Sequence, residues 1–315
     1  MRRCGLTPAS CRLRDSGPAA PERQPATTLD PHPPSIAAVV LCLNAAGDLP
    51  RCLDSLAWCD ERLLVDSGST DGSTERALAH GFRVVEHRQQ GPFSFSVQRN
   101  WALSEAGLSS DWVLFLDQDE AIGATCRTAI QRAIAEAAAA EREGRPSPQG
   151  FELTPRFLFL GRWLRRTQGY PNWHPRLVRR GRLRFEGELW ESFPAGRAVG
   201  RIAAPYEHYA FSQGIDDWLR RHQRYAGYEA DGILAFLAGD GDEALGTQRH
   251  LRLRRLAAQL WPLRPLMRFL QKYIVQGGWL EGWQGLLFCL LMAFYDLITV
   301  VKVIERRRLK RGLPL

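Results

Sequence analysis

The 315-residue sequence has few cysteines and no pair of them in a C-x-x-C pattern. Its seven cysteines are odd in number, and most lie inside apolar segments such as residues 40–43, where small hydrophobic residues also fit. A disulfide framework and a Cys-rich zinc site are therefore disfavoured. A reducing compartment is the simpler interpretation.

The first 34 residues lack the apolar stretch that a secretion signal needs. They are rich in Pro, Arg and Ser, and we predict that residues 1–34 are disordered or an overextended start. The chain also lacks a G-x-G-x-x-G motif, and no Lys follows Gly68 and Gly72 as in a Walker-type loop. These two absences argue against a Rossmann dehydrogenase and a P-loop ATPase.

Acidic residues are scarce in one part of the chain. From Arg249 to the C-terminus there are thirteen Lys and Arg residues and only three acidic residues, Glu281, Asp296 and Glu305, which gives a net charge of +10. The whole chain carries +8, which leaves −2 for residues 1–248. The basic character therefore belongs to the tail, where it favours an anionic partner, and nucleic acid is not predicted as a partner of the remainder.

Short β-rich runs alternate with helical stretches after Pro34. This alternation predicts an α/β fold with a doubly wound, mostly parallel sheet and helices on both faces. The predicted strands are residues 36–43, 63–66, 82–86 and 113–117, and the predicted helices are residues 49–58, 73–80, 97–106 and 124–143. We predict one domain over residues 35–237, with a first half at 35–143 and an aromatic, Arg-rich half at 150–237 that binds the second substrate.

Residues 248–315 are predicted to form a C-terminal basic, amphipathic helical extension. Residues 285–304 are nearly all apolar but are interrupted by Asp296 and Lys302. A transmembrane helix needs about 20 apolar residues, so a span is marginal here and carries a charge near its middle. The basic run at 306–311 favours a helix lying on an anionic membrane surface. A buried core helix and a true span are the alternatives.

The most informative motif closes an apolar strand. Residues 113–116 are followed by Asp117, Asp119 and Glu120. A buried strand has no structural use for three carboxylates. At the carboxyl edge of an open α/β sheet, by contrast, they suit a divalent cation that keeps positions free for a diphosphate. The alternative is a solvated turn before a helix that begins near Ala121.

A second motif, VDSGSTDGST at residues 65–74, closes the second strand and opens a helix. Its small residues, hydroxyls and backbone N–H groups suit a nucleotide at the edge of the sheet. Asp66 is a candidate acceptor for a base N–H or a ribose hydroxyl. The alternative is a helix cap by Thr70 or Asp71, and the two interpretations are compatible.

Four blocks of sequence together resemble family 2 glycosyltransferases. They are residues 36–44, the 65–74 block, QRNWAL at 98–103 and LDQDE at 116–120. Three further segments resemble the lipopolysaccharide-core glucosyltransferase-like branch, and these are residues 161–163, 174–181 and 278–308. The resemblance covers about residues 35–308. It implies a GT-A fold, a nucleotide-sugar donor with a UDP-sugar favoured, a divalent cation (Mg²⁺ or Mn²⁺) and inversion at the anomeric carbon.

The chain departs from that branch at two places. Leu43-Asn44-Ala45-Ala46 stands where the branch has Lys-Asn-Glu-Glu, which bears on the contact with the nucleotide. Trp190-Glu191-Ser192 stands where the branch has His-Glu, so the carboxylate is kept and the imidazole is replaced. The second departure bears on the acceptor.

The resemblance and the transfer chemistry assign roles on the donor side. A nucleoside diphosphate leaves, and a cation held by Asp119, with Asp117 and the late His208, is predicted to neutralise it. A histidine between aromatic residues is as often structural, which is the alternative for His208. The predicted contacts to the nucleotide sugar are Asn44, Asp66, Arg99 and Asp117.

On the acceptor side, the attacking hydroxyl must lose its proton to a carboxylate. Glu191 is the predicted catalytic base, and Glu186 and Glu188 compete with it. Any of the three is alternatively an ion-pair partner of Arg182 or Arg184. The predicted acceptor contacts are His174, Arg176 and Trp163, of which the first two suit an anionic acceptor.

We therefore predict an inverting, metal-dependent glycosyltransferase that acts on a lipopolysaccharide-core or other cell-envelope glycan acceptor. It is predicted to be peripheral, on the cytoplasmic face of the inner membrane. One alternative is the same fold acting on a polyprenyl phosphate. Another is a degenerate, non-catalytic membrane scaffold, motivated by Ala45-Ala46 and Trp190.

Overall fold

The structure is a computed structural model that describes residues 33–91, 93–187, 191–239 and 251–315, with the side chains of Leu251 and Leu253 left out. The predicted disordered segment lies almost wholly outside the described residues. Glu188 and Trp190, which entered the predictions as a competing base and a departure from the family pattern, also lie outside them.

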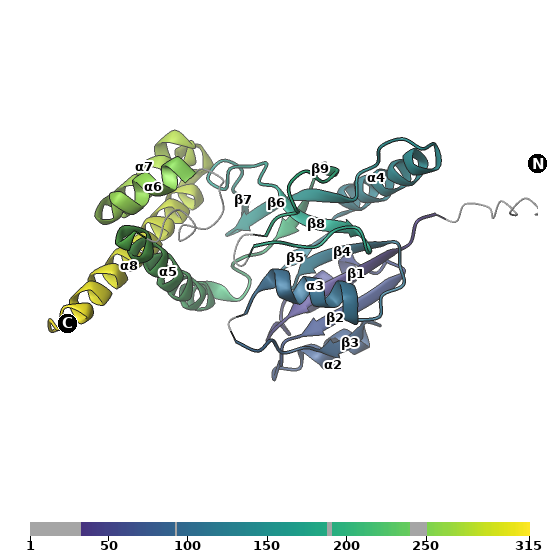
Figure 1. Ribbon diagram of the computed structural model, residues 1–315, viewed down its shortest axis with the longest axis horizontal. Helices are drawn as coiled ribbons and strands as arrows, with labels where there is room; N and C mark the ends of the chain where they lie inside the picture. Colours follow the sequence, from purple (N-terminus) through teal and green to yellow (C-terminus); the bar gives the residue numbers. More distant parts are fainter. Residues whose placement is uncertain (1–32, 92, 188–190, 240–250) are drawn as a thin grey trace, which may run out of the picture. The chain divides into compact units, whose positions relative to one another are not determined.

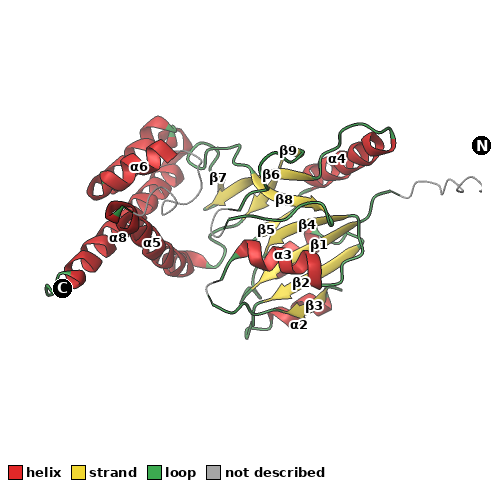
Figure 2. Cartoon of the chain, viewed as in Figure 1, coloured by secondary structure: helices red, strands yellow, loops and turns green. Residues whose placement is uncertain are grey.

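Four parallel strands form the first half of the sheet (Figure 2). They are β1 (Ile36–Cys42), β2 (Glu61–Asp66), β3 (Arg83–Glu86) and β4 (Trp112–Asp117), in the order β3-β2-β1-β4. Every residue of β1 is buried, as expected of a central strand that is covered on both faces. Because the strands are parallel, the carboxyl ends that carry Asp66 and Asp117 meet at one edge of the sheet.

Helices cover both faces of these strands. They are α1 (Leu49–Ser55), α2 (Ser73–Ala79), α3 (Phe95–Glu105) and α4 (Ala124–Arg142). Ala38 and Val40 of β1 belong to the hydrophobic core that includes α1, α2 and α4, whereas Ala37 and Val39 belong to the core that includes α3. This alternation follows from the two-residue period of a strand. The predicted doubly wound α/β fold is confirmed.

The second half of the sheet is mixed in direction. It contains β6 (Gly150–Phe159), β8 (His174–Arg179), β9 (Val199–His208) and the short strands β5 (Glu120–Ala121) and β7 (Arg162–Trp163). β8 runs antiparallel to β4 and joins the two halves, and β6 lies between β8 and β9. β5 pairs with the end of β9 and sets Glu120 opposite His208. This pairing brings the late histidine next to the Asp117–Glu120 turn.

The remaining elements are helical and gather in one group (Figure 1). They are α5 (Gly214–Ala238), α6 (Leu251–Gln259), η2 (Trp261–Leu263), α7 (Arg264–Leu270), η3 (Gln271–Val275), η4 (Gly278–Glu281) and α8 (Gly282–Lys310). Asp296, the charge inside the apolar run, is buried in α8. Arg264 and Arg268 of α7 reach its carboxylate at 2.9 and 2.7 Å. The charge is therefore neutralised between two helices.

α8 is attached to the loop that follows β7. Its Phe288 packs against Phe159 and Leu164. Just before α8, the buried carboxylate of Glu281 accepts hydrogen bonds from the backbone N–H of Arg166 at 2.6 Å and of Thr167 at 3.1 Å, and from the Thr167 hydroxyl at 2.6 Å. The start of α8 and the 164–170 loop are thereby fixed to each other.

One face of α8 is exposed and apolar. Its residues are spaced alternately four and three apart, and we call them the α8 stripe: Trp283, Leu287, Leu290, Phe294, Leu297, Val301 and Ile304. The segment Gly278–Lys310 is long and apolar enough to cross a membrane by length and composition, and it is only partly buried. A C-terminal apolar helix is therefore present.

Candidate active site

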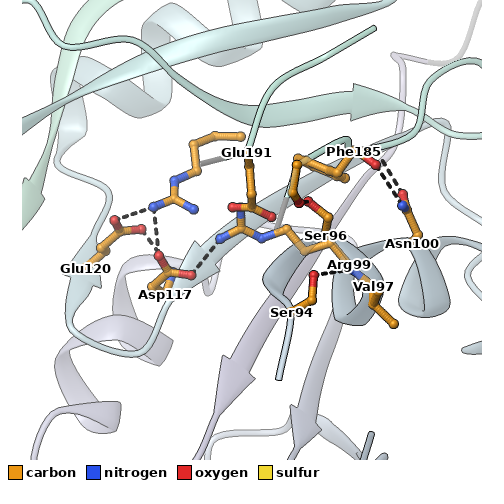
Figure 3. Close-up of polar contacts among 11 residues, drawn as sticks. Ser94, Ser96, Val97, Arg99, Asn100, Asp117, Glu120, Phe185 and Glu191 are labelled. Atoms are coloured by element: carbon orange, nitrogen blue, oxygen red, sulfur yellow. Dashed lines mark hydrogen bonds and ion pairs between the residues drawn. The ribbon is translucent and has the colours of Figure 1, made fainter. Parts of the chain in front are cut away.

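Asp117, at the end of β4, is the centre of an ion-pair network (Figure 3). Arg99 of α3 donates to its Oδ1 at 2.7 Å, and Arg176 of β8 donates to its Oδ2 at 2.8 Å. Both guanidinium groups are buried. Burial alone would raise the pKa of Asp117, but Arg176 and Arg99 outweigh it and hold that pKa well below its usual range.

Arg99 also binds the predicted base. Its Nη1 donates to Glu191 Oε2, so one guanidinium joins Glu191 to Asp117 (Figure 3). The other oxygen of Glu191, Oε1, is buried and has no hydrogen-bond partner among the described residues. Burial raises the pKa of Glu191 by more than Arg99 and Arg176 lower it. Glu191 therefore has a fixed position, a free lone pair and a basicity shifted towards neutral pH.

Arg176 has a second carboxylate partner. It donates to Glu120 Oε1 at 2.6 Å, while Glu120 Oε2 accepts from the backbone N–H of Asp117 at 2.9 Å. Burial raises the pKa of Glu120 to about 7, even though Arg176 acts in the opposite direction. Glu120 was expected at a metal site or a helix start. The structure instead uses it to hold the turn and the arginine in place.

Asp119 lies in a different group of side chains. Its Oδ2 is 3.5 Å from His208 Nε2 and 3.8 Å from Arg221 Nη1 of α5. Burial lowers the pKa of His208, but the carboxylate of Asp119 reverses that effect and raises it. The sequence did not single out Arg221, which lies about a hundred residues further along the chain in an ordinary amphipathic helix.

The Asp66 region forms a tightly bonded loop at the ends of β1 and β2. Asp66 Oδ2 accepts from the backbone N–H groups of Gly68 and Ser69, both at 2.9 Å. Asn44 Oδ1 accepts from the backbone N–H of Thr70 at 2.8 Å. Asp66 and Asn44 thus shape the loop from within. The N-cap residue of α2 is Gly72 with φ +86°, and Asp71 Oδ1 accepts from the backbone N–H of Ser73, the first residue of α2, at 3.1 Å.

The predicted acceptor contacts are not all together. His174 begins β8 next to Arg176, and burial followed by the charge of Arg176 lowers the pKa of His174 to about 3, so its imidazole is neutral. Trp163 lies in β7, where its ring meets Tyr170 edge-on at 5.0 Å and Arg156 lies 5.0 Å above it. Trp163 therefore belongs to a separate aromatic and cationic cluster on the side of the sheet that leads to α8.

The donor set suits a hard cation that completes its coordination with other oxygens. Within the described part of the chain, no three His, Cys, Asp or Glu side chains form a ready-made metal cage. Asp119 and His208 nevertheless approach each other at the edge of the sheet. A carboxylate and an imidazole leave several positions for diphosphate oxygens and water.

Residues 37–142 match the family model described as glycosyl transferase family 2. The chain carries a family 2 glycosyltransferase domain. The match covers β1 to α4, and therefore the strand edge with Asp66, Arg99, Asp117 and Asp119. The GT-A-type α/β fold expected from the resemblance is confirmed.

Two curated relatives match this chain over different lengths. It is 25% identical over 290 residues to the lipopolysaccharide core biosynthesis glycosyltransferase LpsC of Rhizobium meliloti, covering 87% of this chain and 94% of the relative. It is 36% identical over 93 residues to glucosyl-3-phosphoglycerate synthase of Mycobacterium tuberculosis, covering 27% of this chain and 29% of that relative.

Among solved structures, the chain resembles the M. tuberculosis glucosyl-3-phosphoglycerate synthase crystallised with Mn²⁺, uridine diphosphate and phosphoglyceric acid. The TM-score is 0.39 at 17% identity, over 59% of this chain and 73% of that chain. It also resembles Staphylococcus aureus TarS, with a TM-score of 0.34 at 18% identity, over 61% of this chain and 39% of that chain.

Proposed function

We propose that this glycosyltransferase transfers a sugar, with inversion, from a nucleotide-sugar donor to a lipopolysaccharide-core or other cell-envelope glycan. The observation that carries the proposal is the connected path from Glu191 through Arg99 to Asp117, next to Asp119 and His208 at the carboxyl edge of the sheet. A base, a cation-binding pair and a nucleotide loop are the parts that this reaction needs.

On the donor side, Asp119 and His208 would hold a Mg²⁺ or Mn²⁺ ion. Such a cation, when bound, neutralises the charge that develops on the departing diphosphate. The N–H groups of Gly68, Ser69 and Thr70 are bound within the loop, so Asp66, Asn44 and the loop hydroxyls are the groups proposed to meet the nucleotide. A UDP-sugar with Mn²⁺ is the first pair to test, because mycobacterial glucosyl-3-phosphoglycerate synthase, 36% identical over 93 residues, has been crystallised with both UDP and Mn²⁺.

Arg99 has two tasks in this proposal. It fixes Asp117, which is placed to reach the ribose or the cation, and it orients Glu191 through the same planar group. The donor and base sides of the reaction are therefore held at a constant separation. Arg176, buried between Asp117 and Glu120, positions the turn that carries Asp119.

On the acceptor side, Glu191 removes the proton from the attacking hydroxyl while the nucleoside diphosphate leaves from the opposite side of the sugar. General-base assistance of this kind contributes roughly 10²- to 10⁴-fold to the rate. His174, next to the network, and Trp163, further along the sheet, would contact the acceptor.

The extensive similarity to a lipopolysaccharide core biosynthesis enzyme favours a core-type acceptor over the second candidate, a polyprenyl phosphate. The α8 stripe supports a peripheral position on the cytoplasmic face of the inner membrane, where such lipid-linked acceptors are built. Its seven apolar side chains are exposed along α8, and the helix ends in Arg307, Arg308 and Lys310. An apolar face with flanking cations is the pattern of interfacial helices.

The test is a donor-hydrolysis screen with UDP-, GDP- and nucleotide-heptose sugars plus Mn²⁺, followed by transfer to purified core and polyprenyl-phosphate acceptors. The expected result is slow hydrolysis of one donor, abolished by EDTA, and transfer to the core acceptor. Transfer to the polyprenyl phosphate alone would support the second candidate. A folded protein that neither binds nor hydrolyses any of these donors would support the non-catalytic scaffold.

A further inference from the structure

The groove between α5 and α8 has no part in the function proposed above. It encloses about 340 Å³ and opens to solvent. Its lining comes from both helices and consists of Gln223, Arg224, Gly227, Tyr228, Asp231, Lys302 and Arg306. All but one of these residues are polar or charged, so the lining of the groove suits a polar group.

Arg306 holds the two helices together at this groove. Its Nη1 donates to the carbonyl oxygen of Gly227 at 2.7 Å and lies 2.7 Å from a carboxylate oxygen of Asp231. The only carboxylate in the lining is therefore already bound to an arginine. The positive charge of the other cations is left uncompensated.

Those cations are Arg224 of α5 and Lys302 of α8. Within the described residues, neither makes an ion pair or a hydrogen bond, and Lys302 is half-buried. Two such cations next to Arg306 repel one another, and the repulsion ends when an anion with several acceptor oxygens lies between them. The exposed Tyr228 adds a hydroxyl that can donate to the same anion. The chemistry of the groove therefore fits a phosphate group.

The groove also adjoins an apolar surface. Lys302 follows Val301, which is 54% exposed and lies near the C-terminal end of the α8 stripe. One residue is a rotation of about 100° around a helix, so Lys302 lies at the flank of the stripe. When the stripe rests on hydrocarbon, the groove is at the height of the lipid headgroups. A free phosphate would use only the groove, whereas a lipid would use both surfaces.

We propose that the α5–α8 groove binds the phosphate headgroup of an anionic lipid, with the acyl chains lying along the α8 stripe. This inference rests on the membrane association proposed above and is independent of the transfer reaction. It assigns Arg224 and Lys302 to the phosphate, and it leaves Arg306 as the residue that joins the helices.

The test is calorimetric titration of the full-length protein with dihexanoyl phosphatidic acid, which is soluble as a monomer, and with glycerol 3-phosphate, which has the same phosphate without acyl chains. The test variant is R224Q/K302Q. The matched control is R76Q/R132Q, which removes the same charge from exposed positions on α2 and α4. Thermal melting of all three proteins checks that the variants are folded.

We expect saturable binding of the lipid at least about ten-fold tighter than binding of glycerol 3-phosphate, because each buried methylene adds roughly four-fold. R224Q/K302Q should lose this binding at least about ten-fold, and R76Q/R132Q should keep it. Equal affinity for both ligands would replace the lipid with a soluble phosphate ester. An equal loss in both variants, or no saturable binding, would overturn the groove as a site. Full-length protein that binds neither this lipid nor anionic vesicles would instead reject the membrane proposal, while donor hydrolysis would still be testable.

Discussion

Replacement by asparagine is expected to destabilise the fold strongly at Asp117 and only weakly at Asp119. Asp117 lies between two buried guanidinium groups, so Asp117→Asn leaves Arg99 and Arg176 short of one negative charge. Breaking a buried ion pair on one side costs about 3–5 kcal/mol. The side chain of Asp117 is 28% exposed, and we therefore expect the lower end, about 3 kcal/mol of unfolding free energy.

Asp119→Asn removes weaker interactions. Its partners are 3.5 and 3.8 Å away and are themselves 26% and 28% exposed. The Asp119 side chain is only 14% exposed, but both contacts are long and both partners reach solvent, so we expect a loss of about 1 kcal/mol, the upper end for exposed pairs. The variant should melt close to wild type and yet lose Mn²⁺-dependent nucleotide binding, because the proposed cation has lost its carboxylate.

Urea unfolding at pH 7 and at pH 3 is the assay for both variants. Since the pKa of Asp117 is held below its ordinary value of 3.8, its stabilising effect is complete above that pH and is lost as the pH falls through the lowered pKa. The gap between wild type and Asp117→Asn should therefore be present at pH 7 and narrow in acid. If Asp117→Asn is as stable as wild type, or if Asp119→Asn loses as much unfolding free energy as is expected for Asp117→Asn, the division between a structural and a metal-binding carboxylate is wrong.

Three further outcomes are expected. Glu191→Gln should lower the transfer rate by about 10²- to 10⁴-fold and leave donor affinity unchanged, as measured by steady-state rates and nucleotide titration. An unchanged rate would mean that another residue is the base. Truncation before Gly278 should give insoluble protein, since it uncovers Phe159 and Leu164, and a soluble, monomeric product would contradict the packing of α8. Burial, helped by Arg268, lowers the pKa of Lys272 from 10.5 to about 8. The unfolding free energy of the wild type should therefore rise by about 1 kcal/mol from pH 7 to 9, and that of Lys272→Met should lack this rise. Parallel curves of unfolding free energy against pH for the two proteins would refute this.

The sequence predicted the parallel half of the fold well because that half is built from local patterns. Apolar runs ended at Asp66 and Asp117, and the rule that ligands meet the carboxyl ends of parallel strands placed both at one edge. The strand and helix boundaries agree within a few residues, as with the helix predicted at 49–58 and observed at Leu49–Ser55.

Partners that are distant along the chain were not predictable. Arg176 was assigned to the acceptor because its charge suits an anionic acceptor, yet β8 runs antiparallel next to β4 and turns its guanidinium towards Asp117. Arg221 meets Asp119 from a helix that carries no motif. Asp296 was an unexplained charge in an apolar run until α7 supplied two arginines. In each case the pairing depends on tertiary packing, for which one sequence holds no local signal.

Glu281 has a consequence for which acceptors are within reach. Its three hydrogen bonds make the 164–170 loop and the start of α8 a single body, and β7 with Trp163 directly precedes that loop. If α8 rests on the bilayer as proposed, Trp163 stands at a constant height above the lipid. The enzyme would then select the acceptor sugar of a growing chain by its distance from the membrane as well as by its identity.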